Sequence, residues 1–152
     1  MSAEEKLREM GISLPTPPTP QGAYVPVVQT GNLCFIAGQL PMENGRMMAV
    51  GKVPTECELE KAREGAKICA INLLANLRAH LGSLDRVKKI VRVNGFVQSE
   101  KGFYQQPQVI NGASEFLAEV LGEIGVHSRI AVGAAELPLN SAVEIDAIVE
   151  VE

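Results

Sequence analysis

Two segments near the end of the chain place charged side chains within otherwise apolar sequence. Arg129 begins the run RIAVGAAE, and Glu144 lies in the alternating run AVEIDAIVEV. An arginine stays charged at any working pH and is costly to bury unpaired, so we expect an anion to meet Arg129. A carboxylate can accept and return a proton, which gives Glu144 a role in acid–base chemistry. The two residues are therefore candidates for one cleft, whereas Asp146 and Glu150 are expected to face water.

Other kinds of catalytic site have no motif in this chain. The sequence contains no phosphate-binding glycine loop and no G-x-S-x-G nucleophile motif. Its two histidines, His80 and His127, have no Cys or carboxylate cluster at ligand spacing, so no metal site is expected. His80 is interpreted as a last-turn helix residue. His127 precedes Arg129 by two residues, and a role at the mouth of a site stays open for it.

Composition narrows the class of protein further. The 152 residues carry a net charge of -4 and are 46% apolar, which predicts a single domain over 1–152 with its own core. The acidic balance argues against a nucleic-acid partner. Three widely spaced cysteines indicate reduced thiols, and the N-terminus resembles no secretory signal. With no apolar run of membrane-spanning length, we expect a cytoplasmic protein without a membrane partner.

The elements that must position Arg129 and Glu144 follow from periodicity and capping signals. A short helix is expected from the Ser2 capping box to about Gly11, and the proline-rich Leu14–Gly22 should be extended; residues 1–20 thus form an N-terminal extension. A turn is expected at Asn44-Gly45. Strands are predicted over Ala23–Gln29, Asn32–Gln39, Val87–Gln98, Arg129–Glu136 and Ala142–Val151. One long helix is predicted over Glu58–His80, and a second is predicted to start at about Pro107.

This β-β-α-β-α-β-β order predicts an α+β fold in which two helices cover one face of a single sheet. The second face must be wet or covered by another copy, and strand parity assigns Ile90 and Phe96 to it. We interpret that face as a subunit contact. The short link ELPLNSA predicts that the last two strands pair antiparallel.

Three stretches, in order, resemble the reactive intermediate deaminase family, also called the RidA or YjgF-like family. They are GAYVPVVQTGNLCFIAGQLP, VINGAS with the helix after it, and HSRIAVGAAELPLNSAVEIDAIVEV, and together they span about Gln21 to Glu152. The resemblance implies a chorismate-mutase-like fold. It also implies a homotrimer whose sheet faces close into a barrel-like centre, with substrate clefts between subunits.

The resemblance further implies site residues. Arg129, nine positions before Pro138, matches the arginine that grips a substrate carboxylate, and Glu144, six positions after Pro138, matches the acidic residue of the last strand. With Tyr24, which matches an aromatic hydroxyl, they are the expected catalytic residues. The expected substrate-binding residues are Ala37 and Gly38 in the loop near the substrate, Asn111 at the opening of the second helix, and Ala131.

The implied activity is hydrolysis of 2-enamine or 2-imine carboxylates to 2-keto acids and ammonia, so the expected partner is a small carboxylate metabolite. Such a substrate is already reactive, so no cofactor is expected. Two positions depart from the family pattern: Ala131 stands where many members carry cysteine, and Ile130 follows the arginine where serine is common. Non-catalytic binding or sensing of small carboxylates is therefore the alternative. An endoribonuclease is disfavoured by the acidic pI and by the absence of a histidine pair.

Overall fold

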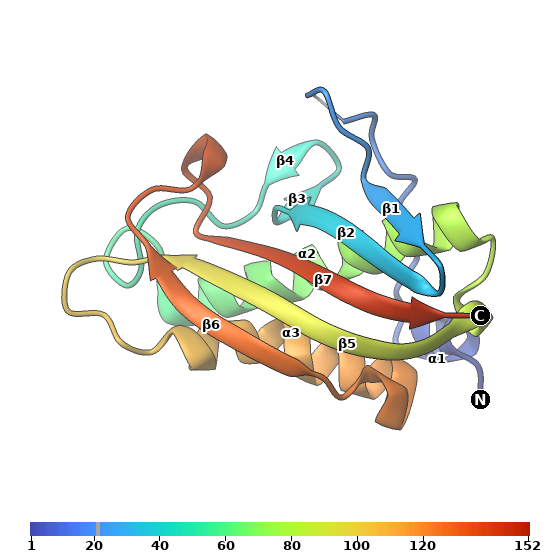
Figure 1. The fold of residues 1–152 in the computed structure, drawn as a ribbon. Coiled ribbons are helices and arrows are strands. Elements are labelled where there is room, and N and C mark those ends of the chain that lie inside the picture. Colours follow the sequence, from blue (N-terminus) through green and yellow to red (C-terminus); the bar gives the residue numbers. More distant parts are fainter. Residues whose placement is uncertain (21) are drawn as a thin grey trace.

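Five strands form one sheet, and two long helices pack against one of its faces (Figure 1). The structure is a computed structural model that describes residues 1–20 and 22–152. Its helices are α1 (Ala3–Glu9), α2 (Leu59–Leu81) and α3 (Gln106–Leu121), with short 3-10 turns η1 (Leu84–Arg86), η2 (Gly122–Gly125) and η3 (Pro138–Asn140). Its strands are β1 (Val27–Thr30), β2 (Leu33–Gln39), β3 (Met42–Glu43), β4 (Arg46–Met47), β5 (Val87–Gln98), β6 (Ser128–Ala134) and β7 (Val143–Val151). This confirms the predicted α+β fold and element order.

Local sequence signals explain where the helices begin and end. The predicted capping box of α1 is present, since Ser2 Oγ accepts from the Glu5 amide and the Glu5 carboxylate accepts from the Ser2 amide. α2 ends at Gly82, whose left-handed backbone (φ 87°) suits glycine. α3 has a proline in its first turn, as predicted.

Two predicted strands are shorter in the structure. β1 begins at Val27 and not at Ala23, because Pro26 has no N–H to donate to a neighbouring strand. β6 ends at Ala134 and not at Glu136, because the chain turns into the loop that leads to η3. The linker expected to be extended has no helix or strand over residues 14–20, and Gln21 lies outside the described residues.

The strand order β1-β2-β7-β5-β6 corrects one prediction. β6 and β7 do not pair with each other, because β5 lies between them. β5 pairs parallel with β6 and antiparallel with β7. α3 connects β5 to β6, and a helical crossover is the usual way to join parallel strands. The link from β6 to β7 therefore crosses over β5.

The core lies between the sheet and the helices. β7 alternates as predicted, and its inward residues are all buried: Val143, Ile145, Ala147, Val149 and Val151. In β5 the predicted parity is wrong at Ile90, which is 0% exposed, whereas its neighbour Val91 is 39% exposed. Register irregularities between β5 and β7 on both sides of Ile90 shift the alternation, so Ile90 points into the core.

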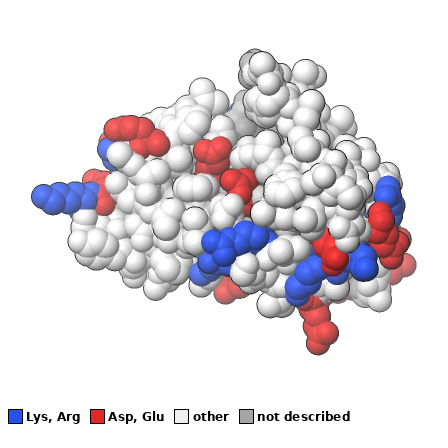
Figure 2. All heavy atoms as spheres, viewed as in Figure 1, with Lys and Arg blue, Asp and Glu red and all other residues white. Residues whose placement is uncertain are grey.

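The opposite sheet face, called the open face below, is covered by no helix of residues 1–20 and 22–152 (Figure 1). Phe96 lies on it, as predicted, opposite Glu144. Figure 2 shows that most of its surface is uncharged. The large apolar side chains that it exposes are Val28 (53%), Phe35 (42%), Ile130 (38%) and Val132 (41%). These residues lie toward the two edges of the sheet, with Glu144 and Asp146 of β7 between them. Exposed apolar side chains on an uncovered sheet face are typical of an interaction surface.

Candidate functional site

Arg129 lies in β6 at the edge of the sheet, and its side chain turns toward α3. Nη1 donates to Ser114 Oγ at 3.0 Å, and Nη2 donates to the Pro107 carbonyl at 3.3 Å. Across residues 1–20 and 22–152, Arg129 takes part in none of the ion pairs. A half-buried guanidinium held only by neutral acceptors keeps its charge available for an anion.

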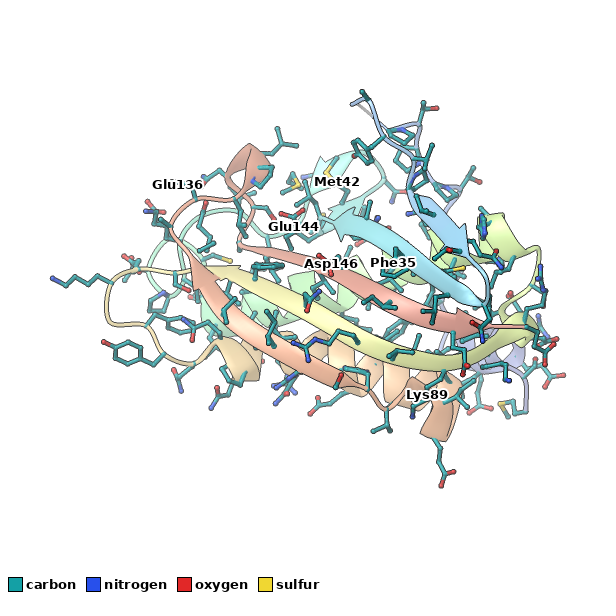
Figure 3. The ribbon with its side chains drawn as sticks, viewed as in Figure 1. Phe35, Met42, Lys89, Glu136, Glu144 and Asp146 are labelled. Atoms are coloured by element: carbon teal, nitrogen blue, oxygen red, sulfur yellow. The ribbon has the colours of Figure 1, made fainter. Side chains whose placement is uncertain are left out.

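Glu144 projects from β7 onto the open face, beside Asp146 (Figure 3). Burial raises the pKa of the Glu144 carboxyl above its ordinary value, and the nearby charge of Asp146 raises it further. Asp146 is itself held by Asn94, whose Nδ2 donates to Oδ1 at 2.7 Å. A raised pKa makes a half-buried carboxyl a better proton acceptor than an ordinary surface glutamate.

A bulge in β2 brings backbone against this carboxylate. The register between β2 and β7 shifts between Ile36 and Gln39, and there a Cβ on Gly38 would overlap a carboxylate oxygen of Glu144. Side chains of the neighbouring elements hold the bulge: Gln39 Nε2 donates to the Ala37 carbonyl, and Asn76 Nδ2 of α2 donates to Gln39 Oε1. The predicted loop residues Ala37 and Gly38 therefore lie beside Glu144.

Arg129 and Glu144 lie on opposite faces of the sheet within one chain. Arg129 is paired with Val93 of β5 and contacts α3, whereas Glu144 is paired with Phe96 on the open face. β6 and β7 are also two strand spacings apart, about 10 Å. One chain thus holds two half-sites, and the structure does not bring the two residues into one cleft.

Two of the other predicted residues lie in the half-site of Arg129. Asn111 and Ala131 are partly buried on the side of Arg129; Asn111 lies in the second turn of α3 and not at its opening. It shares a helix face with Pro107 and Ser114, which both bind Arg129. Tyr24 precedes β1 and is 56% exposed.

Two residues beside Arg129 were not predicted as site residues. Ser114 binds the guanidinium, and its hydroxyl also contacts His127. Ser114 is three positions after Asn111, so helical spacing places both side chains on one face of α3 and could have predicted Ser114 as a site residue. For His127 the only signal in the sequence was its position two residues before Arg129.

A substitution at Gly38 tests the contact with Glu144. Gly38→Ala should destabilise the fold by at most about 1 kcal/mol, because the added methyl group displaces only the flexible end of the half-buried Glu144 side chain. In a Glu144→Ala background the same change should cost almost nothing. Urea unfolding of all four proteins measures this coupling. Equal costs in both backgrounds would show that Gly38 and Glu144 are not in contact.

Comparisons with known proteins agree with this fold. The model of the family described as "YjgF/chorismate mutase-like, putative endoribonuclease" matches residues 4–151. Protein TCP17 of Trypanosoma cruzi is 39% identical over 145 residues, which are 95% of this chain and 91% of that protein. A 2-iminobutanoate/2-iminopropanoate deaminase of Dermatophagoides farinae is 31% identical over 142 residues, with 93% and 95% covered.

A solved structure has the same fold as this chain. The crystal structure of Atu1372 from Agrobacterium tumefaciens superposes with a TM-score of 0.93 at 45% identity and covers 99% of this chain and 92% of its own. Within the described ranges, no helix is both long and apolar enough to cross a membrane. The fold, the order of its motifs and these matches show that the chain belongs to the YjgF/chorismate mutase-like family.

Proposed function

We propose that this protein hydrolyses reactive 2-enamine and 2-imine carboxylates to 2-keto acids and ammonia. The observation that carries the proposal is the guanidinium of Arg129, which is half-buried, fixed by two neutral acceptors and free of a carboxylate partner in the described part of the chain. Such a group can bind a substrate carboxylate through two parallel hydrogen bonds. A relative that is 31% identical is named for this reaction.

Glu144 would supply the proton transfers. Water adds to C2 of the protonated imine while the Glu144 carboxylate accepts a proton from it, which gives a carbinolamine. Glu144 then returns this proton to the amino nitrogen. Ammonia leaves as the hydroxyl group gives its own proton back to the Glu144 carboxylate and becomes the keto oxygen. Burial and Asp146 raise the pKa of Glu144, which matches the group to this double role. Tyr24, Asn111, Ala131 and the Ala37–Gly38 backbone would form the walls of the cleft.

A second copy of the chain would complete the site. Because Arg129 and Glu144 lie on opposite sheet faces, they can act on one substrate only if they come from different copies. The exposed apolar residues of the open face support an assembly in which these faces meet, and the family resemblance suggests that the assembly is a homotrimer. Sedimentation should then show a trimer, and a stable active monomer would contradict the shared site.

The acid limb of the pH–rate profile should depend on Asp146. Glu144 acts as a base only when ionised, so kcat/KM should fall as the pH drops through its raised pKa. Asp146→Asn removes the repulsion that contributes to this shift and keeps an acceptor for Asn94. The acid limb should therefore move to lower pH, as measured by kcat/KM across pH. An unmoved limb would exclude Glu144 as the titrating group.

The activity itself is tested with 2-iminopropanoate and 2-iminobutanoate generated in situ. Release of pyruvate and 2-oxobutanoate should be faster with the protein than with buffer. If purified protein binds 2-keto acids but accelerates no imine in a broad panel, the non-catalytic carboxylate-binding function replaces the proposed one.

A further inference from the structure

A hydrogen-bond relay connects Arg129 to a histidine. Arg129 Nη1 donates to Ser114 Oγ at 3.0 Å, and Ser114 Oγ lies 2.9 Å from His127 Nε2. On the other side of the ring, His127 Nδ1 lies 2.7 Å from the Gly125 carbonyl. The relay therefore joins β6, α3 and η2, and all three of its side chains are partly buried.

The chemistry of the acceptors fixes the protons. A carbonyl oxygen can only accept, so His127 Nδ1 must carry a hydrogen. In the neutral ring Nε2 then has a lone pair, and the Ser114 hydroxyl donates to it. Ser114 Oγ keeps a lone pair for Arg129. The direction of every bond in the neutral relay is thus determined, and the guanidinium is held in one place.

Protonation of His127 would reverse one of these bonds. The imidazolium donates from Nε2 to Ser114 Oγ, which then accepts from both His127 and Arg129. The Ser114 hydroxyl hydrogen becomes free to donate to an anion bound at Arg129. Protonation therefore adds both a positive charge and a donor to the half-site.

We propose that Ser114 and His127 are positioning residues for Arg129 and that they couple carboxylate binding to proton uptake by His127. The carboxylate part of this inference rests on the proposed function, whereas the relay itself does not. By linkage, a carboxylate on Arg129 raises the proton affinity of His127, and acid strengthens carboxylate binding by the same factor.

The charges around His127 explain why a bound carboxylate would raise its proton affinity. Burial lowers the pKa of His127 most, and the positive charges of Arg129 in β6 and Lys89 in β5 lower it further, while the bond to Gly125 opposes the shift. The carboxylates of α3, Glu115 and Glu119, line the groove between α2 and α3. An anion that neutralises Arg129 removes one of the opposing charges.

Nuclear magnetic resonance can follow the relay directly, because the chain has two histidines and His80 serves as an internal control. His80 is exposed and contacts Gln29. In the free protein, the Arg129 Nε–H resonance, assigned by its loss in Arg129→Ala, should shift with the titration midpoint of His127 and not of His80. Saturating 2-oxobutanoate should raise the midpoint of His127 and leave that of His80 unchanged.

Three variants separate positioning from folding. In Ser114→Ala the Arg129 resonance should no longer shift as His127 titrates, and 2-oxobutanoate should bind about 10-fold more weakly. Ser114→Thr keeps the hydroxyl, so it should restore both the shift and the binding. His127→Gln keeps an acceptor without a titrating ring, so binding should persist but lose its dependence on pH.

The outcomes for the relay and for the proposed function are distinct. The relay is overturned if the Arg129 resonance of the folded wild-type protein does not shift as His127 titrates. It is also overturned if that shift persists in Ser114→Ala. If the resonance follows His127 but the protein neither binds 2-oxobutanoate nor hydrolyses imines, the relay stands and the proposed function is wrong.

Discussion

Arg129→Ala should lower kcat/KM for imine carboxylates by about 10²- to 10⁴-fold, because two hydrogen bonds to a charged group contribute about 3–6 kcal/mol. Within residues 1–20 and 22–152 the side chain makes hydrogen bonds to the Ser114 hydroxyl and the Pro107 carbonyl and takes part in no ion pair, so the loss should come from substrate binding and orientation and not from unfolding. Steady-state kinetics with thermal unfolding in parallel measures both effects.

Arg46→Ala is the matched control for this variant. Arg46 is exposed in β4 and is remote from β6 in the strand pairing. It should leave kcat/KM unchanged. Activity of Arg129→Ala within a few-fold of the wild-type value would show that Arg129 does not hold the substrate.

Glu144→Gln should lower kcat by about 10²- to 10⁴-fold, the usual contribution of a general acid–base group. The amide keeps the shape of the side chain beside Gly38 but cannot take a proton. Glu150→Gln is the control, since Glu150 lies on the same face of β7 and accepts from Asn32. A Glu144→Gln enzyme with wild-type kcat would exclude the proton-transfer role.

The same substitution should stabilise the folded chain at neutral pH. Because the folded-state pKa of Glu144 is raised, the folded state binds its proton more tightly, and stability falls as pH rises through that pKa. Removing the ionisable group removes this loss, so the free energy of unfolding should be higher for Glu144→Gln at pH 7. The difference should disappear in acid, as urea unfolding at both pH values would show. A less stable variant at neutral pH would mean that the ionised carboxylate has a favourable partner.

Periodicity was sufficient to predict the five strands of the sheet, the two long helices and the faces of β7, but not every strand boundary. Alternation in β7 separates Ile145 from Glu144 because strand side chains alternate strictly, and the structure has the same division. The alternation failed at Ile90, because a register irregularity in β5 depends on its partner strand and leaves no periodic signal of its own.

Strand order was harder to predict than strand position. The link between β6 and β7 suggested a hairpin, yet eight extended residues can reach about 25 Å, which is ample to cross one strand. The strand–helix–strand order from β5 to β6 was the better signal, since it favours a parallel pair. The Arg129 side chain lies on the helix-covered face of the sheet, where it binds Ser114 and the Pro107 carbonyl. These partners come close to Arg129 only after α3 packs against the sheet, so the sequence pattern alone could not predict the contact.

The central claim is that Arg129 of one copy and Glu144 of another act on one substrate. Arg129→Ala and Glu144→Gln, each inactive alone, can be unfolded together at equal concentration and refolded. Random assembly should place an intact Arg129 opposite an intact Glu144 at about one interface in four, so about a quarter of wild-type activity should return. Wild type refolded with the double variant should also give about a quarter for a shared site, but about half for a site within one chain. No recovery from the two inactive variants, despite mixed assemblies seen by mass spectrometry, would contradict the shared site.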